Sequence, residues 1–321
     1  MTGRTTLRAW ISAFAGITAL AALAVPAEAA GDPFRELPAN VRTFLTAYTA
    51  WGEDPRDVDA YLDLFVSDGS ARLWDSGLQR PIDTPEGIRA QIEGVNRLVP
   101  DYRFVPEEAT ASPDGKVAFV EARNTGTVNG KAVSFRTTHR LVFGDREPAR
   151  VQDGRRSWDQ VELFEPVADA QHPLPGLFDG IASSPGDPRP GVELPTAVRQ
   201  QLWQREKSGA LVAGNAGTAS LSGPGLAAPI TGRASLTAYL DRFFGKVSEL
   251  RLQPGVTVRS GDTTYQEWLG TATAHGGGDA RPIPFAVVER TGPQRWSLRF
   301  DTLDLVASRE TVTVLRERIF G

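Results

Sequence analysis

The chain has 321 residues, no cysteine and a formal net charge of -4. Its length is enough for about two domains, and its charge gives no basic field that would favour nucleic acid as a partner. The lack of cysteine excludes disulfides, thiolate metal ligands and cysteine nucleophiles.

The first thirty residues have the pattern of a secretory signal peptide. Arg4 and Arg8 precede an apolar run over residues 10–25, and Ala27-Glu28-Ala29 offers a small-x-small cleavage site. The run is shorter than the roughly 20 apolar residues that cross a membrane. We therefore expect Sec-type export with cleavage near Ala29-Ala30 and no membrane contact afterwards; an uncleaved anchor is the alternative.

Three helices and a short strand are predicted next along the chain. Apolar residues at helical spacing predict a first helix from Val41 to Tyr48, which Gly52 ends. Asp54 and Pro55 predict the start of a second helix, and a short strand follows over residues 71–75. A third helix is predicted to begin at Thr84-Pro85 and to end before Pro100.

The rest of the first half is predicted to be β-structure, over residues 102–109, 117–127, 131–143 and 149–163. Asn129-Gly130 is a type I′ hairpin signal between two of these strands. Helices followed by a run of antiparallel strands indicate an α+β domain, with helices packed on one face of a curved sheet.

An internal repeat divides the mature chain. "ELPANVRTFL" at 36 returns as "ELPTAVRQQL" at 193, and residues 81–106 match 229–254 without a gap. Near the end, "SWDQVEL" at 157 aligns with "RFDTLDL" at 299, while a gapless alternative places Asp159 opposite Asp304. We expect one domain over 31–165, a Pro/Gly-rich linker over 166–192 and a second, degenerate domain over 193–321.

Four stretches of the first copy carry a family resemblance: "AYLDLFVSDGSARLWD" (60–75), "TPEGIRAQI" (84–92), "THRLVFGD" (138–145) and "ARVQDGRRSWD" (149–159). Their order resembles the nuclear transport factor 2-like superfamily, of the SnoaL-like polyketide cyclase and ketosteroid isomerase type. The resemblance implies two tandem cone-shaped α+β domains, each with a pocket at the open end of the cone. It is specific for the fold and weak for the activity, because one scaffold hosts many chemistries.

Candidate site residues come from strand periodicity and from this resemblance. The alternation in "FRTTHRLVF" places His139 on the apolar face of a half-buried strand. The resemblance implies a hydrogen-bond donor at His139, an acidic partner at Asp153 and a general base near Asp75. The alternatives are a hydrogen-bonded core histidine, a bulge or turn at Asp153-Gly154 and a turn that starts at Asp75. The expected pocket wall consists of Phe44, Tyr48, Tyr61, Trp74, Phe135, Thr137 and Leu141.

A carboxylate and an imidazole in a dry pocket favour proton transfer next to a carbonyl. We therefore expect the first domain to bind a hydrophobic small molecule and to isomerise or cyclise a carbonyl compound, without a cofactor or a metal. The alternatives are a non-enzymatic secreted ligand-binding or interaction module, and water activation of the epoxide-hydrolase type.

The second copy is not expected to share this chemistry. The counterpart of Asp153 is Arg295 or Leu298, and the counterpart of His139 falls near Ala286. The two copies are also candidates to pack against each other as a pseudo-dimer.

Overall fold

The structure is a computed structural model, and it describes residues 34–76, 80–186, 191–215 and 219–320. Phe34–Gly321 form one compact unit. The predicted signal peptide lies outside the described residues. No helix among the described residues has the length and apolar character needed to cross a membrane.

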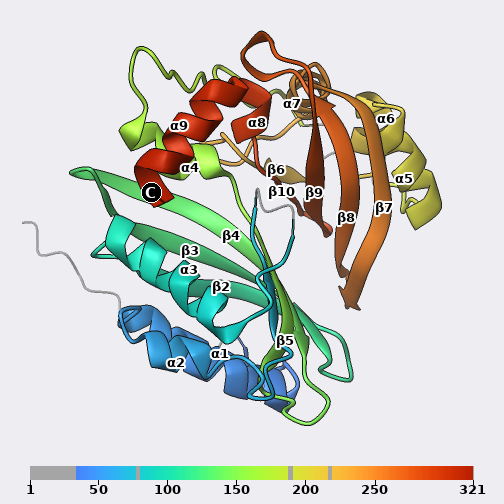
Figure 1. Ribbon diagram of the computed structural model, residues 1–321. Helices are drawn as coiled ribbons and strands as arrows, with labels where there is room; N and C mark the ends of the chain where they lie inside the picture. The colour runs from blue at the N-terminus through green and yellow to red at the C-terminus, as the bar shows by residue number, and fades with distance from the viewer. Residues whose placement is uncertain (1–33, 77–79, 187–190, 216–218, 321) are drawn as a thin grey trace, which may run out of the picture. The chain divides into compact units, whose positions relative to one another are not determined.

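The first copy has the predicted α+β order of elements (Figure 1). Its sheet has the strand order β1-β5-β4-β3-β2, in which β1 is parallel to β5 and the other pairs are antiparallel. The elements are α1 (Ala39–Glu53), α2 (Val58–Leu62), β1 (Arg72–Trp74), α3 (Pro85–Leu98), β2 (Arg103–Ala111), β3 (Val117–Val128), β4 (Lys131–Phe143), β5 (Val151–Ser157) and α4 (Gln160–Phe164).

Local chemistry explains several of these boundaries. The Thr84 hydroxyl accepts a hydrogen bond from Gly87 N, and Pro85 occupies the first turn, so α3 begins where it was predicted to begin. Asn129 and Gly130 both have positive φ, as the type I′ hairpin requires. The prediction for α2 was displaced by one turn, because Asp57 rather than Asp54 caps this helix.

The predicted strand over 149–163 is wrong in its second half. Strand β5 ends at Ser157 and the chain turns into α4, because the Asp159 carboxylate accepts a hydrogen bond from Val161 N and caps that helix. The short 3-10 helix η1 (Glu165–Val167) follows.

The second copy repeats the order of the first, and the α+β prediction is confirmed for both. Its sheet has the order β6-β10-β9-β8-β7, again with one parallel pair, β6 and β10. The elements are α5 (Thr196–Gln204), α6 (Ser208–Ala213), β6 (Ser220–Ser222), α7 (Arg233–Phe244), β7 (Val247–Ser260), β8 (Thr263–Ala274), η2 (Gly276–Gly278), β9 (Arg281–Thr291), β10 (Arg295–Arg299), α8 (Leu303–Val306) and α9 (Arg309–Phe320).

Strand pairing gives the residue-by-residue equivalence of the two copies. Leu73 pairs with Ile82 and with Gly154, and Leu221 pairs in the same way with Ile230 and Trp296. Gly154 therefore corresponds to Trp296, and the same register places Asp153 opposite Arg295. This pairing supports the alignment of residue 157 with residue 299 over the gapless alternative.

The register also corrects the expected counterpart of His139. His139 lies opposite Arg156 in the first sheet, and Glu289 lies opposite Leu298 in the second. Since Arg156 corresponds to Leu298, His139 corresponds to Glu289 and not to Ala286. The sequence alignment missed this because the copies differ in hairpin length on either side of β9.

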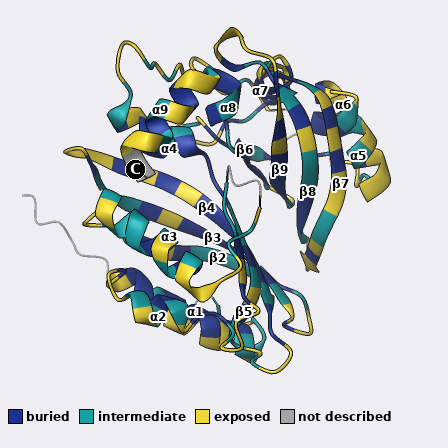
Figure 2. Cartoon of the chain, viewed as in Figure 1, coloured by how far each residue is buried: buried dark blue, intermediate teal, exposed yellow. Residues whose placement is uncertain are grey.

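Helices cover one face of each sheet and bury a large apolar core. In the first copy α1 packs on β2, and its residues Val41, Phe44 and Leu45 are at most 2% exposed. Helices α3, α5 and α9 each carry both buried and exposed residues (Figure 2). Phe178, in the Pro/Gly-rich segment, stacks on Tyr239 with ring centroids 4.0 Å apart.

The uncovered faces of the two sheets contact each other through equivalent residues. Phe119 and Tyr265 correspond in the register and stack with their ring centroids 5.0 Å apart. Glu121 and Glu267 also correspond, and each buried carboxylate pairs with arginines of the other copy. Glu121 binds Arg295, and Glu267 lies 3.3 Å from Arg155.

Candidate functional site

A cavity of about 590 Å³ lies between helix α3 and the concave face of the first sheet. Its wall is largely apolar and includes Val95, Leu98, Phe135, Trp158 and Leu163. Polar side chains make up about half of the lining residues, namely Asp75, Ser76, Gln91, Arg97, Tyr102, Asn124, Thr137, His139, Arg156, Gln160 and Arg316. Ligand sites usually combine apolar walls with placed polar groups.

His139 lies in the wall of this cavity and is only 3% exposed. Its Nδ1 lies 3.1 Å from the hydroxyl of Tyr48 on α1, and its Nε2 lies 2.7 Å from the Thr137 hydroxyl. Burial, followed by the nearby Arg156 cation, lowers the pKa of His139 well below its usual value. The imidazole is therefore neutral at physiological pH, with both nitrogens engaged.

Two further residues, Asn124 and Tyr102, extend this polar chain across the cavity wall. Asn124 Nδ2 donates to the Phe135 carbonyl at 3.3 Å and to the Thr137 hydroxyl at 3.2 Å. Because a carbonyl can only accept, the amide orientation of Asn124 is fixed, and its Oδ1 accepts from the Tyr102 hydroxyl. The chain runs from Tyr48 through His139, Thr137 and Asn124 to Tyr102.

The chain also selects a tautomer of His139. Burial raises the pKa of Tyr48 well above its usual value, so this hydroxyl keeps its proton. If Tyr48 donates to Nδ1, then Nε2–H donates to Thr137, and the Thr137 oxygen accepts two hydrogen bonds. The remaining hydroxyl hydrogen then belongs to Thr137, which lines the cavity. The other tautomer would leave the spare hydrogen on Tyr48, inside the core.

Asp75 also lines the cavity, but its carboxylate is fully engaged. One oxygen accepts from Ser76 N at 3.0 Å and from Trp158 Nε1 at 2.7 Å, and the other accepts from Gln91 Nε2 at 2.7 Å and from Arg156 Nη2. Four donors saturate the lone pairs of a carboxylate. The arrangement makes Asp75 an anchor for Arg156.

Arg156 is the arginine of this wall that pairs with Asp75, and no pattern in the sequence pointed to it. The Asp75 carboxylate holds its pKa above the usual value in spite of burial. Arg156 Nε is buried without a hydrogen-bond partner among the described residues. A guanidinium that is bound through one nitrogen and has another nitrogen without a partner is suited to bind an oxygen atom of a ligand.

The structure does not bring Asp153 to His139. A β-bulge at Gln152 changes the pairing from Val142–Asp153 to Phe143–Val151, so Val151 and Asp153 point to opposite faces of the sheet. Val151 enters the core, and the Asp153 carboxylate pairs with Arg140 on the face turned toward the second copy. A regular strand would place Val151 and Asp153 on the same face, and the bulge places them on opposite faces.

The other expected pocket residues are divided among several places. Phe135 and Thr137 line the main cavity. Phe44, Tyr48 and Tyr61 surround a void of about 20 Å³ on the far side of His139. Trp74 lines a different cavity, together with residues of the second copy. Leu141 is buried in the apolar core.

The polar groups of the first cavity are absent from the equivalent positions of the second copy. By strand register, Asn124, Thr137 and Arg156 correspond to Gly270, Val287 and Leu298. Two small residues of the first copy, Ala122 and Gly154, correspond to the fully buried Trp268 and Trp296. The indoles add buried volume to the second copy at positions where the first copy has small residues.

Glu289, at the position of His139, organises these tryptophans. Its carboxylate accepts from Trp268 Nε1 at 3.0 Å, from Trp296 Nε1 at 2.8 Å and from Nε and Nη2 of the Arg199 guanidinium. The ion pair with Arg199 keeps the pKa of Glu289 low in spite of burial. The second copy thus builds a packed core at the place where the first builds a site.

A metal site finds no support within the described residues, because they contain no group of three or more histidine, aspartate or glutamate side chains that could hold an ion. The charged groups of the first cavity are instead the guanidinium groups of Arg97, Arg156 and Arg316 and the Asp75 carboxylate, and its other polar groups are neutral. These groups suit an oxygen-bearing organic ligand.

Comparison with known proteins agrees with this fold. Residues 41–151, about a third of the chain, match the family model of the SnoaL-like domain. This match confirms the predicted resemblance for that part of the first copy. No match to a curated protein was found.

Several solved structures are similar to part of the chain. PrhC from Penicillium brasilianum is 15% identical over 40% of this chain and 87% of its own, with a TM-score of 0.35. A putative SnoaL-like polyketide cyclase from a Jannaschia species is 20% identical over 40% and 90%, with a TM-score of 0.34. A protein of unknown function from Burkholderia pseudomallei, described as nuclear transport factor 2-like, is 20% identical over 40% and 98%, with a TM-score of 0.35.

Proposed function

We propose that the first copy binds one apolar small molecule that carries a hydrogen-bonding oxygen, and that the second copy is a scaffold. The observation that carries this proposal is the cavity of about 590 Å³, whose wall includes the Thr137 hydroxyl and the Arg156 guanidinium. The volume lies within the usual range of small-molecule sites, about 300–1,000 Å³.

Binding is favoured over acid–base catalysis by the state of the three candidate catalytic residues. His139 is neutral and bonded at both nitrogens, and the Asp75 oxygens accept from four donors. Asp153 lies on the opposite face of the sheet. Among the described residues of the cavity wall, no carboxylate or imidazole is free to take a proton, and the same reasoning weighs against activation of water for epoxide opening.

Isomerisation or cyclisation of a carbonyl compound is the second candidate. The observation that favours it is the pair of donors on Thr137 and Arg156, which could hold a developing enolate oxygen in a dry cavity. The discriminating measurement is deuterium incorporation into a bound carbonyl ligand in heavy water. Protein-dependent exchange next to the carbonyl would support catalysis, and its absence would support a binding function.

Two further parts of the proposal concern the whole chain. We propose that residues 1–30 direct export, which N-terminal sequencing of the protein recovered outside the producing cells would test. We also propose that the two copies act as an internal pseudo-dimer. The stack of Phe119 on Tyr265 and the exchanged carboxylates Glu121 and Glu267 support this arrangement, because equivalent residues meet in it.

A variant with a larger side chain in the cavity wall tests whether a ligand binds there. Gly94 lies on α3 in the cavity wall, and a Cβ atom there would meet only Arg97 Nη2, at 3.8 Å. The Gly94→Leu variant should therefore occupy the cavity without disturbing the backbone. The matched control is Gly209→Leu on helix α6, where a Cβ atom meets nothing within 4 Å.

The measurement is mass spectrometry of small molecules extracted from each purified protein. We expect a compound in the wild type and in Gly209→Leu that is lost from Gly94→Leu. A compound retained by all three proteins, or no compound in any of them after exposure to an extract of the producing organism, would contradict the proposal.

A further inference from the structure

A second cavity, of about 720 Å³, adjoins the first and is bounded by both copies. The two cavities share Asp75, Ser76, Arg156 and Arg316 in their walls. These four residues form a thin polar partition between an apolar chamber and a chamber with many charges.

The second cavity carries an excess of positive charge. Five arginines line it, against three aspartates: Arg155, Arg156, Arg281, Arg309 and Arg316, against Asp75, Asp301 and Asp304. The charge of Arg155 is partly neutralised by the Glu267 carboxylate, which does not line this cavity. Burial raises the pKa of Asp301 to about 8, so this carboxyl adds little negative charge at neutral pH.

Two guanidinium groups in this wall have donors to spare. Arg281 is 6% exposed, and its Nη1 is buried without a hydrogen-bond partner among the described residues. Nε of Arg156 shares this condition, whereas Nε of Arg155 lies 3.3 Å from the Glu267 carboxylate. Buried polar groups are normally hydrogen-bonded, so two unpartnered guanidinium donors beside one cavity, within an excess of arginines, point to an anionic ligand.

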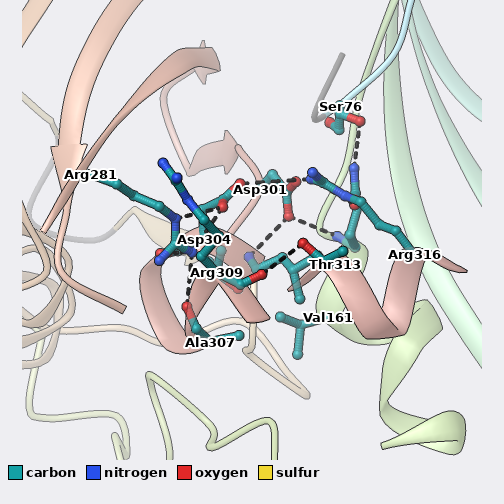
Figure 3. A network of polar contacts seen from close by, with 12 residues as sticks. Ser76, Val161, Arg281, Asp301, Asp304, Ala307, Arg309, Thr313 and Arg316 are labelled. Atoms are coloured by element: carbon teal, nitrogen blue, oxygen red, sulfur yellow. Dashed lines mark hydrogen bonds and ion pairs between the residues drawn. The ribbon is translucent and has the colours of Figure 1, made fainter. Parts of the chain in front are cut away.

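The partition is held by polar contacts that a ligand could exchange. Figure 3 shows Arg281 and Arg316 on either side of Asp304, at 2.9 Å and 3.7 Å from its carboxylate oxygens. Arg316 also donates to Gln160 at 3.4 Å, and Gln160 donates to the Ser76 carbonyl. The Arg316 contacts are long, so this side chain is the weakest part of the wall.

We propose that one amphipathic carboxylic acid occupies both cavities, with its apolar body in the first and its carboxylate on the arginines of the second. This inference rests on the proposed binding function and names its ligand class. The second copy then has a direct role, because Arg281 and Arg309 belong to it. It supplies the charged half of a site whose apolar half lies in the first copy.

Two probes that differ only in their head group test this proposal. cis-Parinaric acid is a fluorescent long-chain carboxylic acid, and its methyl ester keeps the chain but not the charge. The full mature chain is titrated with each probe. Charge-assisted hydrogen bonds make the acid the tighter ligand by about tenfold or more.

Variants locate the two halves of the site. Arg309→Gln and Arg281→Gln should lower the ratio of acid to ester affinity toward one. Arg309→Gln is less disruptive to the fold because Arg309 is exposed, whereas Arg281 also donates a hydrogen bond to the Ala307 carbonyl. Arg259→Gln is the control, since Arg259 pairs with Glu193 on the surface and should leave the ratio at its wild-type value.

The outcomes separate this inference from the proposed function. If Gly94→Leu abolishes binding of both probes but acid and ester bind the wild type equally, the cavity binds ligands and the carboxylate proposal is wrong. If Gly94→Leu weakens neither probe, both proposals are wrong. An acid preference that persists in both Arg281→Gln and Arg309→Gln also overturns the inference.

Discussion

Asp159 and Asp301 occupy equivalent positions in the two copies, and each carboxylate caps helices of both. Asp159 accepts from Val161 N in its own copy and from Thr302 N in the other, at 3.2 Å and 3.0 Å. Asp301 accepts from Leu303 N and from Gln160 N, both at 3.1 Å. Hydrogen bonds to these two aspartates therefore link the first turns of α4 and α8.

This pair predicts that the protein becomes less stable as the pH rises. Burial, together with the neighbouring carboxylates, raises the pKa of Asp159 to about 7 and that of Asp301 to about 8. Between about pH 4 and pH 8 the folded state thus holds more protons than the unfolded state, and the free energy of unfolding falls as these protons are lost. We expect a slope of about 2 kcal/mol per pH unit on average in the upper half of this window.

Denaturant titrations from pH 5 to pH 8.5 measure this slope. The Asp301→Asn variant, whose amide oxygen can still cap the helix, should have a shallower slope than the wild type. The exposed Asp262→Asn is the control and should keep the wild-type slope. Equal slopes in wild type and Asp301→Asn would show that this pair does not titrate in the window.

Two neighbouring buried threonines make a matched test of the polar chain. Thr137→Val leaves Asn124 Nδ2 and His139 Nε2 without their acceptor, which should cost about 2 kcal/mol of the free energy of unfolding. Thr138 is 1% exposed and its hydroxyl has no partner among the described residues, so Thr138→Val should be neutral or stabilising by up to about 1 kcal/mol. Chemical denaturation of both variants gives the comparison, and equal losses would contradict the role of Thr137 as the link between Asn124 and His139.

The cavity-filling variant has an expected effect on stability as well as on binding. Gly94 lies inside helix α3, and a residue with better helix propensity should raise the free energy of unfolding by about 0.5–1 kcal/mol. Thermal unfolding followed by circular dichroism measures this gain. A loss of more than about 1 kcal/mol would mean that the added side chain does not fit the cavity.

The second copy should respond in the opposite way to loss of volume. Trp296→Ala removes buried volume at the position that Gly154 holds in the first copy, and it removes a donor from Glu289. We expect a loss of about 3–5 kcal/mol, typical of a large buried aromatic residue. A loss below about 1 kcal/mol would argue that the second copy already holds a cavity.

Local signals in the sequence predicted much of the fold. Thr84-Pro85 and Asn129-Gly130 act within one turn of chain, so their effect does not depend on the rest of the molecule. The α+β class follows from element order in the same way. The repeat was found because residues 81–106 and 229–254 keep the same spacing from helix to strand.

The site was harder to predict because it depends on long-range pairing. The bulge at Gln152 reverses the face of Asp153, and Asp153-Gly154 signals a bulge or turn without fixing the register. No local signal marks Arg156, because its partner Asp75 is 81 residues away in the chain. Asn124 carried a usable signal that was overlooked, since it shares the buried alternation of Val120 and Ala122 on β3.

The central claim is that one ligand binds per chain, in the first copy. Isothermal titration of the mature protein with the extracted compound measures the stoichiometry directly. We expect one ligand-binding site per chain in the wild type and in Gly209→Leu, and none in Gly94→Leu. Two sites per chain, or one site that survives in Gly94→Leu, would contradict it.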